Sequence, residues 1–137
     1  MRKFIEQVTL PLVVMELPKS EADGRTIDDI IEHLRARISA HHCARFIGVF
    51  DHYAHTRGLP DGEIAPDIID ARNVVFCFGM AIPHPTSLAT RPRSVGICEL
   101  ADRFVLSFLQ APMPIANAAI EGWLTEFAER STAPAVS

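Results

Sequence analysis

The amino-acid sequence predicts an α+β fold, in which a mainly antiparallel sheet of about five strands carries two helices packed on one face. Two observations predict it. Apolar residues recur at helical spacing in two segments, residues 26–38 and residues 116–127. One short apolar run precedes the first segment, and four more follow each other between the two segments. Because consecutive strands favour antiparallel pairing, the expected element order is β-α-β-β-β-β-α.

The first strand and the first helix have clear local signals. Residues 8–17 form an apolar run that Pro18 closes, and Pro11 favours either an edge position or a strand that starts after it. Thr26 is a good N-cap for the helix, with Asp29 three residues on in the capping-box position. The expected apolar stripe of this helix is Ile27, Ile30, Ile31, Leu34 and Ile38.

Residues 43–53 predict a second strand with alternating faces. Alternation places Asp51 and His52 on opposite faces of the sheet. The face shared with His52 is expected to carry Ala44, Phe46, Gly48 and Phe50. Residues 54–72 then form a long connection, in which a single helical turn is expected at residues 67–71.

The later half predicts three strands and a closing helix. Residues 73–80 are nearly all apolar, which favours an inner strand covered on both faces, with Cys77 in the core. The prolines of residues 81–93 argue against regular structure there. Residues 94–100 and 103–110 predict a tight hairpin. The helix after Pro114 is expected to bury Ala116, Ile120, Trp123, Leu124 and Phe127.

Size and charge limit the classes of function. The chain has 137 residues, which suits one domain, expected over residues 1–130, with a flexible tail at residues 131–137. A net charge of −4 argues against nucleic acid and anionic membranes as partners. The 3 cysteines form no CxxC pair, which favours a reducing compartment, the cytoplasm. No stretch approaches the ~20 apolar residues of a membrane-spanning helix.

The end of the second strand is the first candidate site. Asp51, His52 and His55 open the long connection, and strand ends that feed loops often carry functional groups. His52 is equally explained as a half-buried residue that bonds to the backbone. With His84, these side chains supply enough nitrogen and oxygen donors for a metal centre, provided that the loop of His84 folds back to join them. His41 and His42 are better explained as favourable charges at a helix C-terminus.

The Pro-rich loop is the second candidate site. Arg91 and Arg93 flank Pro92, and two neighbouring guanidinium groups can clamp one carboxylate or phosphate, although a solvated loop explains them as well. Gly79 precedes this loop and permits a sharp turn or the close approach of a ligand. The chain lacks the GxGxxG, GxxxxGK[ST], GxSxG, HExxH and paired CxxC patterns, so no cofactor is expected.

Several of these segments together resemble a bacterial family known as domain of unknown function 302. The resemblance rests on Ile47–His52, on Phe76–Gly79 with the loop that follows, and on the last hairpin with Ala111-Pro112, and it spans roughly residues 17 to 128. It implies a fold like that of the TATA-box-binding protein, often assembled as a dimer, with no established activity. The sequence departs from the family pattern at residues 80–85, which suggests a divergent or sister member.

These observations leave two functional hypotheses open. The first is a module without a catalytic constellation, which binds an unidentified small molecule or forms a homodimer. The second is a small enzyme that depends on a metal or a cofactor and uses Asp51, His52, His55 and His84. The two hypotheses differ in whether the three histidines converge on one cavity.

Overall fold

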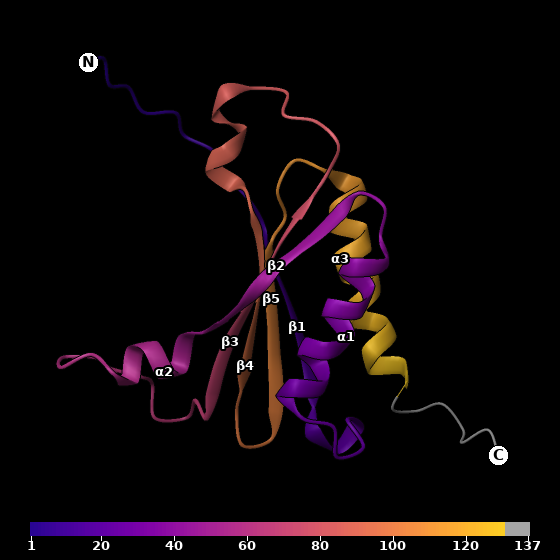
Figure 1. Ribbon diagram of the computed structural model, residues 1–137. Coiled ribbons are helices and arrows are strands. Elements are labelled where there is room, and N and C mark those ends of the chain that lie inside the picture. Colours follow the sequence, from indigo (N-terminus) through magenta and orange to yellow (C-terminus); the bar gives the residue numbers. More distant parts are fainter. Residues whose placement is uncertain (131–137) are drawn as a thin grey trace.

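The computed structural model describes residues 1–130, which form one sheet with helices on one face (Figure 1). Within this range, the five strands are antiparallel in the order β1-β5-β4-β3-β2. The strands are β1 (Leu12–Pro18), β2 (Ala44–Asp51), β3 (Asp70–Phe78), β4 (Arg93–Glu99) and β5 (Arg103–Leu109). The helices are α1 (Ile27–Ala40), α2 (His52–Arg57) and α3 (Pro114–Arg130), with the 3-10 helices η1 (Lys19–Glu21) and η2 (Pro85–Thr90). The α+β prediction is confirmed, and the predicted tail at residues 131–137 lies outside the described residues.

The core lies between the sheet and the two long helices. Figure 1 shows α1 and α3 together on one face of the sheet, whereas α2 and η2 lie on its other side, at opposite ends. The largest fully buried side chains are Phe76, Phe104, Ile30, Leu34, Ile38, Ile97, Ile120, Leu124, Val74 and Val95. Each such side chain contributes about 1.5–3 kcal/mol through burial of apolar surface. Most of the apolar burial that stabilises the fold therefore occurs on the helix-covered face of the sheet.

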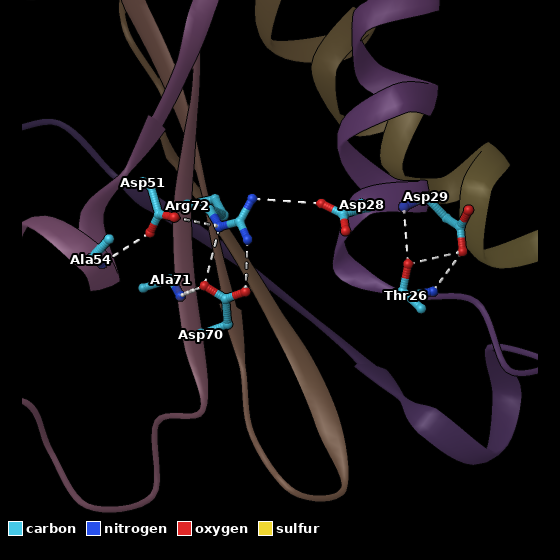
Figure 2. Close-up of polar contacts among 8 residues, drawn as sticks. All are labelled: Thr26, Asp28, Asp29, Asp51, Ala54, Asp70, Ala71 and Arg72. Atoms are coloured by element: carbon cyan, nitrogen blue, oxygen red, sulfur yellow. Dashed lines mark hydrogen bonds and ion pairs between the residues drawn. The ribbon is translucent and has the colours of Figure 1, made fainter.

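Two predictions for the first third of the chain are confirmed. Strand β1 begins directly after Pro11 and lies at the edge of the sheet, so both expectations for that proline hold. The capping box of α1 is present, because the backbone N–H of Thr26 donates to Asp29 Oδ2 at 2.7 Å and the N–H of Asp29 donates to Thr26 Oγ1 at 3.4 Å (Figure 2). These two bonds satisfy donors that a helix N-terminus otherwise leaves unpaired.

A β-bulge in β2 overturns the predicted alternation of its side chains. Phe46 pairs with Phe76, but the register shifts at Ile47, so that Gly48 pairs with Val75. Phe76 is fully buried on the helix-covered face, whereas its neighbour Val75 lies on the opposite face. The side chains that were predicted to share one face of β2 therefore lie on both faces of the sheet, because the extra residue at the bulge moves all later side chains to the opposite face.

Strand β2 also ends earlier than predicted. Its last residue, Asp51, is the N-cap of α2, and its side chain accepts a hydrogen bond from the N–H of Ala54 at 2.9 Å. His52 therefore begins a helix instead of ending a strand. The helical turn expected at residues 67–71 was wrong, because β3 begins at Asp70.

The prediction that β3 is covered on both faces was also wrong. Phe76 and Phe78 face α1 and α3 and are buried, but Cys77 is exposed and Val75 is half-buried. Both long helices pack on the same face, so Cys77 lies on the side that they leave open, outside the core. The expectation of no regular structure in residues 81–93 is corrected too, since η2 occupies part of that connection.

The C-terminal predictions are confirmed. Strands β4 and β5 form a tight hairpin, closed by a hydrogen bond from the N–H of Leu100 to the carbonyl of Arg103 at 2.8 Å. The buried face of α3 includes Ala116, Ile120, Trp123, Leu124 and Phe127. None of the helices within residues 1–130 is both long and apolar enough to cross a bilayer.

Buried His33 predicts a pH dependence of stability. It lies between α1 and α3, with Nε2 2.8 Å from the carbonyl oxygen of Trp123, and burial lowers the pKa of His33 below its ordinary value of 6.5. The hydrogen bond to the Trp123 carbonyl and the charge of Glu126 oppose this lowering of the pKa, whereas Arg130 and Arg37 add to it. Below about pH 6.5 the unfolded chain binds a proton at this histidine that the folded chain excludes. The free energy of unfolding therefore decreases as the pH is lowered.

The measurement is the urea midpoint between pH 7 and pH 5. We expect the midpoint to fall in the wild type and to fall less in a His33→Gln variant, in which the amide keeps a hydrogen-bond donor but does not titrate. Equal slopes in the two proteins would contradict this assignment.

Candidate functional site

A cavity of about 610 Å³ lies between the end of β3, the start of β4 and the connection that joins them. Its walls are Cys77, Phe78, Gly79, Met80, Ala81, Ile82, Leu88, Arg91, Pro92 and Arg93. The wall is mostly apolar, and two guanidinium groups are its charged members. A cavity of this size, with few polar groups on an apolar wall, has the usual composition of a small-molecule site.

Gly79 shapes one side of this cavity. Its φ angle is +132°, a conformation that side chains disfavour, and a Cβ atom there would lie 2.7 Å from Met113 Cε. The N–H of Gly79 donates to the carbonyl oxygen of Cys43 at 2.8 Å, which ties the end of β3 to the start of β2. Gly79 therefore has a backbone conformation that favours glycine, and Met113 occupies the space that a side chain at this position would need.

Arg93 is held rigidly in the cavity wall by α3. The residue is only 6% exposed. Its Nη2 donates to the carbonyl oxygen of Leu109 at 2.8 Å and to Asn117 Oδ1 at 2.7 Å. Asn117 in turn donates from Nδ2 to the carbonyl oxygen of Ala111 at 2.7 Å. Two neutral oxygens, one of them on the side-chain amide of Asn117, therefore orient the guanidinium group without neutralising its charge.

The charge of Arg93 has no counterion among the described residues. None of the ion pairs within residues 1–130 includes Arg93, and its buried Nη1 has no hydrogen-bond partner there. Burial lowers the pKa of Arg93, and the positive charge of Arg91 lowers it further. An arginine nevertheless remains protonated at neutral pH. A buried positive charge without a partner is costly, so its presence calls for an explanation.

Arg91 has a different role from Arg93, although both line the cavity as a pair. Arg91 is half-buried, and its Nη1 donates to the carbonyl oxygen of Ala81 at 2.5 Å. This bond spans the connection and holds its two ends together. Arg91 and Arg93 both line this cavity. Arg91 fixes the loop through its bond to Ala81, whereas Nη1 of the buried Arg93 has no hydrogen-bond partner among residues 1–130.

The strand-end candidates lie elsewhere and are exposed. His52 Nδ1 is 2.9 Å from Asn73 Oδ1, and Asn73 Nδ2 donates to Ser94 Oγ at 3.1 Å. The rings of His52 and His55 are 6.3 Å apart, and each packs against Phe50. This chain of contacts crosses three strands on the surface of the sheet. It orients the exposed His52 toward the side-chain amide of Asn73, so the expectation of a half-buried histidine bonded to the backbone was wrong.

Asp51 is committed to structure. It caps α2, and its Oδ2 lies 3.6 Å from Arg72 Nε. Figure 2 shows Arg72 among three carboxylates, with Asp70 Oδ2 at 3.0 Å from Nη2 and Asp28 Oδ1 at 3.5 Å from Nη1. Hydrogen bonding to Asp70 is the main cause that raises the pKa of Arg72. The cluster joins α1, β2 and β3, and sequence analysis missed it because its members are far apart in the chain.

The structure does not bring His84 together with His52 and His55. His84 is the N-cap of η2, which follows the Phe78 end of β3, whereas His52 follows the Asp51 end of β2. Those two ends of the β2–β3 pair are roughly 20 Å apart at about 3.3 Å per residue, and Figure 1 shows α2 and residues 85–90 at opposite ends. A shared metal needs bonds of about 2.1 Å to each ligand, so these three histidines do not form one site.

A different group of metal donors lies at the end of α1. His41, His42 and Cys43 each offer one ligand atom, and these atoms all lie within 4.8 Å of one another. The sequence analysis considered the two histidines only as helix-end charges. The signal was nevertheless present in the sequence, as two imidazoles and a thiol on consecutive residues.

Comparison with known proteins identifies a family for this chain but no activity. Neither the curated proteins nor the solved structures contain a match to it. The resemblance to domain of unknown function 302 stays a prediction. A model of the family of unknown function DUF6858 matches residues 1–129, nearly the whole described range, and the chain therefore belongs to that family.

Proposed function

We propose that this protein binds a small amphipathic anion in the cavity between β3 and β4, with a carboxylate or phosphate group on Arg93. The observation that carries the proposal is that Arg93, a residue of the cavity wall, is buried and that its Nη1 has no hydrogen-bond partner among residues 1–130. A bound anion supplies both the hydrogen-bond acceptor and the negative charge that this guanidinium group lacks.

The remainder of the wall indicates an apolar body for the ligand. Met80, Ile82 and Leu88 line the cavity, yet each is more than half exposed. A ligand with an aliphatic or aromatic body would cover these three side chains, and burial of apolar surface favours binding by about 25 cal/mol per Å². A bare phosphate or acetate would contact Arg93 but leave these side chains in water.

The test is titration calorimetry with decanoate and with 1-decanol, which share a chain length but differ in charge. Decanoate is expected to bind the wild type more tightly than 1-decanol does. Arg93→Met keeps the length of the side chain and removes its charge, and we expect decanoate to bind this variant about 10 to 100 times more weakly, as for loss of a charged hydrogen bond.

The matched control is Arg45→Met. Arg45 is an exposed residue that pairs with Cys77 at the same end of the sheet, but it does not line the cavity. Decanoate should bind this variant as it binds the wild type. Equal losses in the two variants, or equal binding of decanoate and 1-decanol by the wild type, would contradict the proposal. Circular dichroism checks that each variant is folded.

Three further expectations stay proposals. A non-catalytic binding role agrees with the commitment of Asp51 to structure and with the separation of His84 from His52, but an enzyme remains the alternative. The free thiols of all three cysteines suit the cytoplasm, where thiols are kept reduced. Assembly as a homodimer stays a prediction from the sequence.

A further inference from the structure

The segment that joins α1 to β2 concentrates metal-binding side chains. His41 is the C-cap residue of α1, and His42 and Cys43 complete the connection to β2. One ligand atom from each of the three lies within 4.8 Å of the others. Within residues 1–130, His41, His42 and Cys43 are the one group of three or more His, Cys, Asp or Glu side chains whose donor atoms lie close enough to hold a metal ion. It is separate from the guanidinium groups of the proposed anion site.

The donor set selects the class of metal. Two imidazole nitrogens and one thiolate are ligands for Zn²⁺ and similar transition metals, whereas Ca²⁺ and Mg²⁺ prefer oxygen ligands. Bonds of about 2.0 to 2.3 Å in tetrahedral geometry place ligand atoms roughly 3.6 Å apart. Donor atoms at most 4.8 Å apart therefore need to approach one another by about 1.2 Å or less, and the exposed His42 is the side chain with the most room to move.

One hydrogen bond and ring packing hold the side chain of His41 in a fixed orientation. The backbone N–H of Cys43 donates to His41 Nδ1 at 3.1 Å, so this nitrogen carries a lone pair and no proton. The ring is packed between Phe78, at 4.6 Å between centroids, and the stacked ring of His42, at 4.9 Å. Its edge meets Trp123 at 6.2 Å. A metal ion at Nδ1 takes the place of the Cys43 N–H at this lone pair, so its binding breaks that hydrogen bond, whereas the ring itself is held in place by its packing.

The position at a helix end favours a cation. The last carbonyl groups of a helix carry a partial negative charge, and α1 ends beside these three residues after 14 residues. Metal binding also removes the proton of Cys43, and the thiolate that forms adds a full negative charge. The half-buried environment of His41 and Cys43 reduces competition from water.

The geometry points to a transition-metal site formed by His41, His42 and Cys43, which binds Zn²⁺ through two nitrogens and one sulfur. Three protein ligands leave a fourth tetrahedral position for water or another ligand, as in zinc sites that are not closed by the protein. The site borders the cavity wall, because Phe78 contacts the ring of His41 and Gly79 donates to the carbonyl oxygen of Cys43.

Cobalt spectroscopy of the full, untagged chain tests this assignment. After removal of metals with a chelator, Co²⁺ is titrated and the absorption spectrum is recorded. We expect visible bands of tetrahedral Co²⁺, together with a near-ultraviolet charge-transfer band from the thiolate, saturating at one Co²⁺ per chain. Addition of Zn²⁺ should bleach both features, because Zn²⁺ has no such transitions and binds the same donors more tightly.

Variants identify the ligands. Cys43→Ser should remove the charge-transfer band, and His42→Ala should weaken Co²⁺ binding by at least about tenfold. Cys77→Ser and His84→Ala are the matched controls, since the first is an exposed thiol and the second an exposed imidazole outside the group, and both should leave the spectrum unchanged. A spectrum without the charge-transfer band, or a band that survives Cys43→Ser, would overturn the assignment. Circular dichroism before metal addition confirms that each variant is folded.

Discussion

Replacement of Phe76 with alanine is expected to lower the free energy of unfolding by about 3–5 kcal/mol, the largest effect that we foresee for a single substitution. Phe76 is fully buried at the centre of the sheet, and its ring lies 6.0 Å from that of Trp123 in α3. Its pairing partners are Phe46 in β2 and Arg93 in β4. Truncation therefore leaves a cavity where two strands and a helix meet, and the surrounding elements cannot all move to fill it.

Urea titration followed by circular dichroism measures this loss. Phe4→Ala is the matched control, because Phe4 is 66% exposed in the segment before β1, and surface substitutions usually change stability by less than about 0.5 kcal/mol. A Phe76→Ala midpoint close to that of Phe4→Ala would show that the packing around Trp123 does not have the importance assigned to it.

Replacement of Arg72 with methionine is expected to cost about 2 kcal/mol of stability. Arg72 makes two hydrogen bonds to Asp70, of 3.1 and 3.0 Å, in a half-buried position. It also faces Asp51 and Asp28 at longer range (Figure 2). Without the guanidinium group, three carboxylates face one another with no positive charge between them. The loss should shrink in about 0.5 M salt, which screens repulsion between partly exposed charges.

Arg35→Met provides the control for this experiment. Arg35 forms an exposed pair with Glu32 one turn away on α1, with a shortest distance of 2.7 Å, and pairs of that kind contribute only about 0.3–0.5 kcal/mol. Urea titrations of both variants at low and high salt give the comparison. If Arg35→Met is as costly as Arg72→Met, the cluster that joins α1, β2 and β3 is no more than a set of surface pairs.

Local sequence signals predicted the elements whose stability is local. Thr26 and Asp29 mark the start of α1 because both halves of a capping box lie within one turn. The β4–β5 hairpin was predictable for the same reason, since its turn and its strands are contiguous. Helix α2 was missed because its six residues carry no apolar periodicity, and its start depends on a capping bond from Asp51.

The errors in β2 and β3 come from interactions that a single strand does not encode. The bulge at Ile47 depends on the register with β3, and alternation within β2 alone gives no sign of it. Cys77 was assigned to the core because its strand is nearly all apolar, which favours cover on both faces. The same sequence is also compatible with a strand that is covered on one face. Only the shared position of α1 and α3 on one face decides that Cys77 is exposed.

The same limit applies to the candidate site. The proximity of Arg91 and Arg93 was readable from their spacing, but the burial of Arg93 depends on Asn117, 24 residues away in α3. The proposed link between His84 and His52 failed for the opposite reason. That link required the loop of His84 to fold back toward His52, but the length of the β2–β3 pair separates the two residues.

The pairing of β1 with β5 has a consequence for synthesis of the chain. Among the described strands, β1 is made first and finds its only partner in the last strand. A nascent polypeptide therefore carries a seven-residue apolar strand with both of its edges open until residue 109 has been added. Open strand edges invite pairing with other chains. Productive folding thus has to wait for translation to be nearly complete, and incomplete products that stop before β5 should aggregate or be captured by chaperones.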